Sequence, residues 1–417
     1  MTCTLIRRLL LCLALNVFNV HAIPVLDNVT QNATNTIMAR LPFQKVRIVN
    51  DSSSNSNHSS SALLQERSYY GLTSIYNDNQ VQYLVNIQVG TPSQTFVVIV
   101  DTGSPKFWVP SIDCPASQCP LVDFNASKST TLTDCHSNFS ITYAGGYAKG
   151  SLVTDHVTLA GISVENQAFG LVTSTAETVT GYVSSIPFHM AANQLLTEPI
   201  FSICTNSIYQ DGWAGDIILG GMNTSDFVGN LSYVPVAPDP ITQQYTFWQI
   251  DTKSVSLTSA VGNTLITTSP DFNPRVITTV DTGTTFSYMS NDYIKSMMRA
   301  ITGQVPRELD SGSGCYPIDC AYAYAEENDF NVVFELSVSD ADKTTLITIP
   351  VNELVEPVDN TSIQYAHRCV FSLCPTSAPT MLLGDSVIRA LYLVFDMEHK
   401  QMGFAPSLNT DSTVSQY

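Results

Sequence analysis

Short segments in which apolar and polar residues alternate dominate the chain. Two of them, residues 81–89 and 95–100, flank a turn at residues 90–93 (GTPS). Alternation at every second residue, bounded by Gly, Pro and Asn, predicts half-buried strands, and this pattern recurs to the C-terminus. Helical periodicity is rare and is clearest in residues 291–301, with Asn291 as the expected N-cap. We therefore predict an all-β fold.

The N-terminus has the features of a secretion signal. Arg7 and Arg8 precede an apolar run at residues 9–17, and small residues near Ala22 suit cleavage there. The run is too short to span a bilayer, so we predict a cleaved signal at residues 1–22. Asn-x-Ser/Thr sequons agree with a glycosylated, secreted product. They begin at Asn28, Asn32, Asn50, Asn57, Asn125, Asn138, Asn223, Asn230 and Asn360.

Cysteine usage agrees with export to an oxidising compartment. Of the ten cysteines, two leave with the signal and an even number remains, which predicts disulfides but leaves about 105 pairings open. Zinc is disfavoured because the close pairs lack the two-residue spacing of zinc knuckles, and we expect no metal and no cofactor. The remaining cysteines are Cys114, Cys119, Cys135, Cys204, Cys315, Cys320, Cys369 and Cys374.

Charge separates an N-terminal segment from the rest of the chain. Residues 1–70 carry six basic and three acidic residues, whereas the remainder carries 12 basic and 33 acidic residues, a net charge of −21. Such a body repels nucleic acid and anionic membranes, and acid relieves its self-repulsion. Residues 41–49 form a basic amphipathic stretch, followed by a Ser/Asn run at 50–61 that cannot build a core. We interpret them as a docking segment and a tether.

The sequence Val-Asp-Thr-Gly occurs twice, each time after β-branched residues. Its aspartates, Asp101 and Asp281, are 180 residues apart, which predicts two homologous lobes that bring them together. Two carboxylates a hydrogen bond apart share one proton, so the ionised one can activate water while the other protonates a carbonyl. That is amide hydrolysis without a metal. The residues expected to hold these carboxylates are Gly103, Ser104, Gly283 and Thr284.

Four motifs resemble those of pepsin-like aspartic peptidases, and the resemblance covers residues 75–408. They are IVDTGSPKFWVPS, FSITYAGGYAKGSL (139–152), VDTGTTFSYM and residues 381–406. The last resembles the segment that passes behind the second active-site loop. The resemblance implies catalytic roles for Asp101 and Asp281 with support from Ser104, Thr284, Gly103 and Gly283. It also implies a flap that binds substrate through Tyr143, Trp108, Gly145 and Gly146, and we expect the Trp108 indole to donate to the Tyr143 hydroxyl.

The resemblance also implies a bilobal fold around a cleft for extended polypeptides, sensitivity to pepstatin-type inhibitors and synthesis as a zymogen. Lys45 and Arg47 are the expected inhibitory residues of the propeptide, with acid-triggered self-cleavage near residues 60–70. We expect a monomer with no membrane partner, secreted or delivered to an acidic vacuolar compartment. The expected segments are propeptide 23–69, N-terminal lobe 70–240, C-terminal lobe 241–408 and tail 409–417.

Two departures weaken the resemblance. Pro105 stands where pepsin-like peptidases usually have a small polar residue. An extended backbone tolerates proline at this position. More seriously, residues 172–185 contain no segment of Asp-Gly-Ile-Leu-Gly type, the first-lobe counterpart of residues 382–384, so we expect no strand behind Asp101. A mis-spliced gene model is our favoured explanation. The alternatives are that residues 179–186 substitute by another path, or that the chain is a catalytically impaired binding or inhibitor-like protein.

Overall fold

A computed structural model provides the structure of the chain. It describes residues 38–42, 44–47, 81–119, 123–143, 146–176, 182–183, 185–205, 215–239, 243–267, 276–324, 330–339, 343–360, 362–408 and 410–417. The expected signal, the sequons at Asn28, Asn32, Asn50 and Asn57, and the expected cleavage region at residues 60–70 lie outside these residues.

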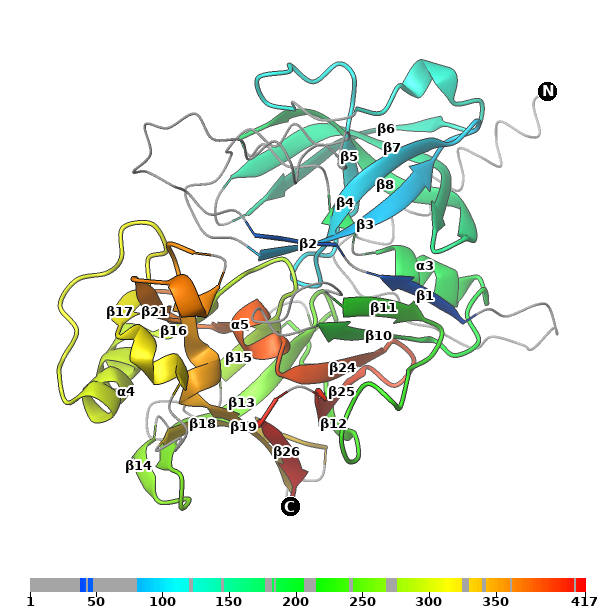
Figure 1. Ribbon diagram of the computed structural model, residues 1–417. Coiled ribbons are helices and arrows are strands. Elements are labelled where there is room, and N and C mark those ends of the chain that lie inside the picture. Colours follow the sequence, from blue (N-terminus) through cyan, green and yellow to red (C-terminus); the bar gives the residue numbers. More distant parts are fainter. Residues whose placement is uncertain are drawn as a thin grey trace.

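One large sheet is built from the first half of the chain, drawn mainly in cyan and green (Figure 1). The long hairpins predicted by the alternating pattern form its body, and Gly90 makes their first turn with φ at 89°. In spatial order its strands are β2 (Gln44–Arg47), β3 (Val81–Val89), β4 (Gln94–Val100), β9 (Tyr182–Val183), β5 (Trp108–Pro110), β8 (Ile162–Thr175), β7 (Tyr147–Leu159) and β6 (Thr133–Thr142).

A second large sheet comes from the other half of the chain. Its ordered strands are β22 (Leu373–Thr376), β16 (Ser287–Ser290), β23 (Met381–Leu383), β15 (Val276–Val280), β13 (Gln249–Ser259), β18 (Phe330–Ser337), β19 (Thr344–Pro350) and β26 (Thr413–Gln416), with β14 (Thr264–Thr267) beside β13. A small sheet holds β17 (Tyr316–Ile318), β21 (Cys369–Phe371) and β20 (Val355–Pro357). Residues 413–416, expected to be part of a tail, thus extend the second sheet as β26.

A six-stranded sheet joins the two halves (Figure 1). Its ordered strands are β1 (Ala39–Pro42), β11 (Gly215–Leu219), β10 (Ile200–Thr205), β24 (Leu391–Asp396), β25 (Gln401–Pro406) and β12 (Ser232–Pro235). At its centre β10 and β24 run antiparallel, with Phe201 opposite Phe395. These rings stack with centroids 4.4 Å apart, so equivalent positions of the two halves pack on each other. The predicted all-β bilobal fold is confirmed.

Helices are short and few in the described residues. The α-helices are α3 (Ile186–Ala192), α4 (Asn291–Thr302) and α5 (Asp385–Ile388), and the 3-10 helices are η1 (Ala126–Lys128), η2 (Cys320–Tyr324), η3 (Val351–Leu354) and η4 (Ile363–Tyr365). The predicted helix is α4, but Ser290 occupies its N-cap position and Asn291 begins the helix. The Asn291 side chain instead accepts a hydrogen bond from the Tyr316 hydroxyl, which explains its place there. Within the described ranges, no helix has the length and apolar character needed to cross a membrane.

Three disulfides are present among the described residues, which answers the pairing question that the sequence left open. They are Cys114–Cys119, Cys315–Cys374 and Cys320–Cys369. The even count suggested that all eight cysteines would pair, but Cys135 and Cys204 are buried outside these disulfides. Burial raises the pKa of the Cys204 thiol to about 12, so this cysteine is not a thiolate at physiological pH.

Candidate active site

Asp101 lies at the end of β4 and is almost completely buried, with 4% of its surface exposed. The backbone N–H of Gly103 donates to its Oδ1 at 2.9 Å. The Ser104 hydroxyl donates to its Oδ2 at 2.5 Å. Both carboxylate oxygens therefore have fixed donors within the same tight loop, as the sequence predicted.

Asp281 lies at the end of β15 with 8% of its surface exposed, and its contacts repeat the first set. The Gly283 N–H donates to Oδ1 at 2.7 Å, and the Thr284 hydroxyl donates to Oδ2 at 2.5 Å. The same donor types in the same order hold both carboxylates. The repeated sequence thus encodes a repeated geometry.

Thr102 and Thr282 tie the two loops together, a role that the sequence reasoning missed. Each backbone N–H donates to the other residue's hydroxyl, at 3.2 Å from Thr102 and 3.0 Å from Thr282. Each hydroxyl in turn donates to a carbonyl of the opposite strand, Val280 at 2.9 Å or Val100 at 2.8 Å. The sequence did contain a signal for this contact, because both copies of Val-Asp-Thr-Gly include the threonine. When two equivalent residues lie about a twofold axis, they can bind each other.

Gly103 and Gly283 allow the two carboxylates to face each other closely. A Cβ atom on Gly103 would lie 2.2 Å from the carboxyl carbon of Asp281, and one on Gly283 would lie 2.7 Å from Oδ1 of Asp101. Any side chain at either position would displace the opposite carboxylate. The glycines therefore determine the distance between the aspartates as well as the shape of their own turns.

The electrostatics of this pair favour one retained proton. Burial, and then the neighbouring charge of Asp281, hold the pKa of Asp101 well above its ordinary value. Hydrogen bonds from Ser104 and Gly103 lower this pKa, but their effect is smaller. A carboxyl facing a buried carboxylate keeps its proton where an exposed aspartate would lose it, and this is the state that general acid/base hydrolysis requires.

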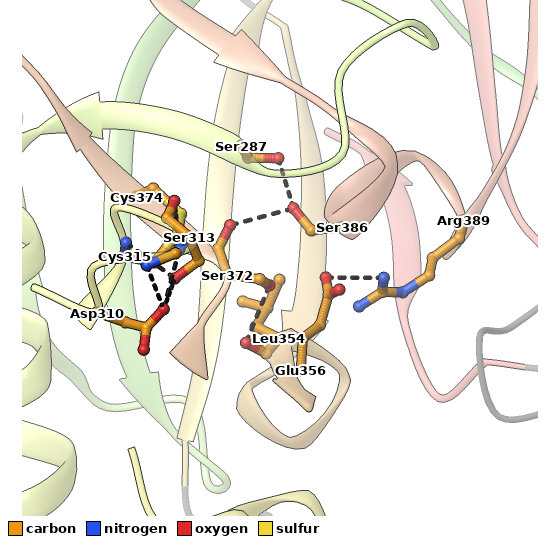
Figure 2. Close-up of a disulfide and its surroundings, with 11 residues drawn as sticks. Ser287, Asp310, Ser313, Cys315, Leu354, Glu356, Ser372, Cys374, Ser386 and Arg389 are labelled. Carbon is orange, nitrogen blue, oxygen red and sulfur yellow. Dashed lines mark hydrogen bonds and ion pairs between the residues drawn. A yellow bond between two sulfur atoms is a disulfide. The ribbon is translucent and has the colours of Figure 1, made fainter. Parts of the chain in front are cut away.

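A strand supports the Asp281 loop from behind, as the sequence predicted for residues 381–406. Strand β23 runs parallel to β15, and the Asp281 N–H donates to the Leu383 carbonyl at 2.9 Å. The Gly384 N–H donates to the Ser287 hydroxyl at 3.0 Å. Figure 2 shows how Ser287 continues into a chain of hydroxyl contacts through Ser386 at 2.9 Å and the Ser372 carbonyl at 3.2 Å.

Buried charges reinforce this support. Arg389 forms ion pairs with Glu356 at 2.9 Å, drawn in Figure 2, and with Asp385 at 3.4 Å, and all three side chains are buried. The Tyr83 hydroxyl, from β3 in the first half, donates to Asp385. The Asp385 N–H donates to the Thr284 carbonyl at 2.8 Å, so the cluster is linked directly to the Asp281 loop. The sequence analysis did not identify these residues.

The expectation that Asp101 lacks a supporting strand is wrong. Strand β9 runs parallel to β4, with Tyr182 opposite Ile99 and Val183 opposite Val100, and it also contacts Trp108 of β5. In the second half, β23 makes the same parallel pairing with β15 and the same single antiparallel pairing with β16. Of the three explanations, the one in which residues 179–186 substitute for the missing segment agrees with this pairing, which involves Tyr182 and Val183. It removes the reason to suppose mis-splicing or an impaired chain.

Tyr143 lies at the end of β6, at the tip of the β6–β7 hairpin. Its hydroxyl accepts the predicted hydrogen bond from the buried Trp108 indole at 2.8 Å. Its backbone N–H donates to the Gly146 carbonyl at 2.8 Å, which closes the hairpin turn. Gly145 lies outside the described residues. The hairpin tip is thus tied to the segment that follows Asp101.

The expected inhibitory residues Lys45 and Arg47 both fall on β2, and Arg40 of the same expected propeptide lies on β1. Lys45 and Arg47 are opposite Tyr83 and Val81 in the β2–β3 pairing, but their side chains lie outside the described residues. Arg40 of β1 forms an ion pair with the buried Asp216 of β11 and reaches Asp226 at 3.7 Å. This segment therefore docks on both the first large sheet and the joining sheet.

Comparison with known proteins agrees with this geometry. The family model described as eukaryotic aspartyl protease matches residues 82–186 and 177–407. Cathepsin E of Mus musculus is 31% identical over 80% of this chain and 82% of its own length, and cathepsin E of Rattus norvegicus is 30% identical over the same shares. Mucorpepsin of Rhizomucor pusillus is 24% identical over 80% of both chains.

Proposed function

Because the chain belongs to the eukaryotic aspartyl protease family, we propose that it is a secreted aspartic endopeptidase in which Asp101 and Asp281 hydrolyse peptide bonds at acidic pH. The observation that carries the proposal is the pair of facing carboxylates, each held by one backbone and one hydroxyl donor. The pair can take one proton from a water and give another to a substrate, which is the chemistry that peptide hydrolysis needs.

In the proposed reaction the dyad begins with one proton. The ionised carboxyl takes a proton from water as the water oxygen attacks the peptide carbonyl carbon, and the protonated carboxyl donates to the carbonyl oxygen. The resulting tetrahedral diol collapses when the protonated carboxyl gives its proton to the peptide nitrogen, the ionised carboxyl takes a proton from one diol hydroxyl and the C–N bond breaks. The products are a carboxylic acid and an amine, and the dyad again holds one proton. Ser104 and Thr284 hold the outer oxygens of Asp101 and Asp281, which keeps the inner oxygens directed at the water.

The β6–β7 hairpin closes over the substrate in this proposal. Tyr143 excludes water from the reacting bond, and its hydrogen bond to Trp108 defines the closed position. Extended polypeptides with apolar side chains around the scissile bond are the proposed substrates. Pepstatin-type inhibitors, which the family binds, would occupy the same site.

Synthesis as a zymogen is also proposed, with β1 and β2 belonging to the inhibitory segment. Arg40 is half exposed while its partner Asp216 is buried, so this ion pair is one attachment that must break before β1 can leave the joining sheet. Lys45 and Arg47 are the proposed contacts to the dyad. Self-cleavage near residues 60–70 would then release the segment.

The test is hydrolysis of an unfolded protein by purified chain after acidification. We expect pepstatin-sensitive cleavage, with Asp101→Asn and Asp281→Asn each lowering kcat by about 1000-fold or more. Asp292→Asn, which changes an exposed carboxylate on α4, is the matched control. Well-folded chain with no turnover between pH 2 and 6 would refute the proposal. Normal maturation of isolated Asp101→Asn protein in acid would refute self-cleavage only.

A further inference from the structure

Lys106 is a charged residue in the segment that links Asp101 to Trp108. Residues two apart in an extended segment point the same way, so Lys106 and Trp108 both face the β6–β7 hairpin. Between them Phe107 faces the opposite way and is buried, with its ring 5.2 Å from that of Phe169. Pro105 restricts the backbone just before Lys106. The segment therefore presents two side chains to the hairpin from a fixed backbone.

The ammonium group of Lys106 contacts β6 at two points. Nζ donates to the Ser140 carbonyl at 2.8 Å, and it lies 5.5 Å from the centroid of the Phe139 ring. That ring is itself fixed, because a Cβ atom on Gly170 of β8 would lie only 2.5 Å from it. Partial burial lowers the pKa of Lys106, which agrees with an ammonium held against protein and not extended into water.

We propose that Lys106 is a positioning residue for Tyr143. Its ammonium fixes the strand three residues before Tyr143, while Trp108 fixes the Tyr143 hydroxyl. The two attachments hold both the backbone of β6 and the Tyr143 side chain against the segment that follows Asp101. The proposal rests on the proposed peptidase function and concerns how firmly the hairpin meets a bound peptide.

Steady-state kinetics on a fluorogenic peptide test this role. Lys106→Met keeps the length of the side chain but removes the charge and donors, so we expect KM to rise about fivefold with kcat within twofold, the size of one partly exposed charged hydrogen bond. Lys106→Arg should return KM to within twofold of the native value. Lys253→Met is the control, because Lys253 donates to the Lys343 carbonyl at 3.2 Å in the second half.

A double-mutant cycle separates positioning from a general loss of stability. If Lys106 acts through Tyr143, Lys106→Met should raise KM less than twofold in a Tyr143→Phe background. Calorimetry with a pepstatin-type inhibitor measures binding without turnover. It should show that Lys106→Met raises Kd by the same factor as KM. Additive effects, an unchanged KM in Lys106→Met, or failure of Lys106→Arg to restore it would overturn the inference. An inactive native protein would instead count against the proposed function.

Discussion

Behind Asp281 runs a three-residue strand, β23, followed by buried hydroxyls and charges, whereas behind Asp101 runs the two-residue strand β9. The donors to both carboxylates are nevertheless the same in type and order. Parallel pairing to the strand that carries each aspartate is also common to both halves. Holding the two carboxylates in the same way therefore depends on a backbone strand paired behind each aspartate. The side chains of that strand can differ between the halves.

The residues that follow the two supporting strands should differ most in their tolerance of substitution. A Cβ atom on Gly384 would lie 2.2 Å from the Phe286 carbonyl oxygen and 2.6 Å from that of Thr284. Gly384→Ser should therefore lower kcat/KM by about 100-fold or prevent folding, because it displaces the Asp281 loop. Ser184, which follows β9, lies outside the described residues, and Ser184→Gly should stay within about threefold of native. Kinetics with circular dichroism would check both, and an active Gly384→Ser protein would contradict the comparison.

The buried charges behind Asp281 should contribute strongly to stability. Arg389→Met leaves Glu356 and Asp385 as buried carboxylates without their guanidinium, so we expect the free energy of unfolding to fall by about 3–5 kcal/mol. Arg368→Met is the control, because Arg368 is mostly exposed and its buried partner Asp310 keeps hydrogen bonds from Gly312 and Ser313, so we expect a cost of about 1 kcal/mol. Urea unfolding measures both. An equal loss of unfolding free energy in the two variants would show that burial of the Arg389 cluster does not increase its contribution to stability.

Disulfides give a smaller difference between the halves. Cys315–Cys374 closes a separation of 59 residues around the Cys320–Cys369 bridge, whereas Cys114–Cys119 closes only five. With the inner bridge intact, replacing Cys315 and Cys374 by alanine should cost roughly 3 kcal/mol, against about 2 kcal/mol for the first-half pair, in the chain-entropy account. Thermal unfolding of the two double variants provides the measurement. The opposite order would mean that local packing outweighs chain entropy.

Asp101→Asn should give the smallest effect at the acid end of the pH range, and one that grows as pH rises. Its raised pKa means that the folded state holds the proton more tightly than the unfolded state. This stabilisation is complete below the ordinary aspartate pKa of about 3.9 and is lost as pH rises toward the folded-state pKa. Asp101→Asn should therefore gain stability relative to native protein by up to about 1.4 kcal/mol per pH unit in that interval. Unfolding between pH 3.5 and 6 tests this, and a pH-independent difference would refute it.

Features repeated along the sequence could be predicted, while those defined by contacts between distant residues could not. Alternation predicted β3 and β4, and the duplicated motif predicted how Asp101 and Asp281 would be held. A strand of two residues such as β9 shows no alternation, and backbone hydrogen bonds require no particular side chain. The sequence likewise gave no signal that Tyr83 and Asp385, 302 positions apart, would meet.

The joining sheet also determines when the protein can finish folding. The β10 residue Ser202 accepts a hydrogen bond from the β24 residue Tyr392, 190 residues later. At 5–20 residues per second, a ribosome needs about 10–40 s to make the intervening chain. During that time β10 has one edge without its final neighbour, and an open strand edge can pair with other chains. Successful production of this protein therefore depends on protecting that edge until the last tenth of the chain emerges.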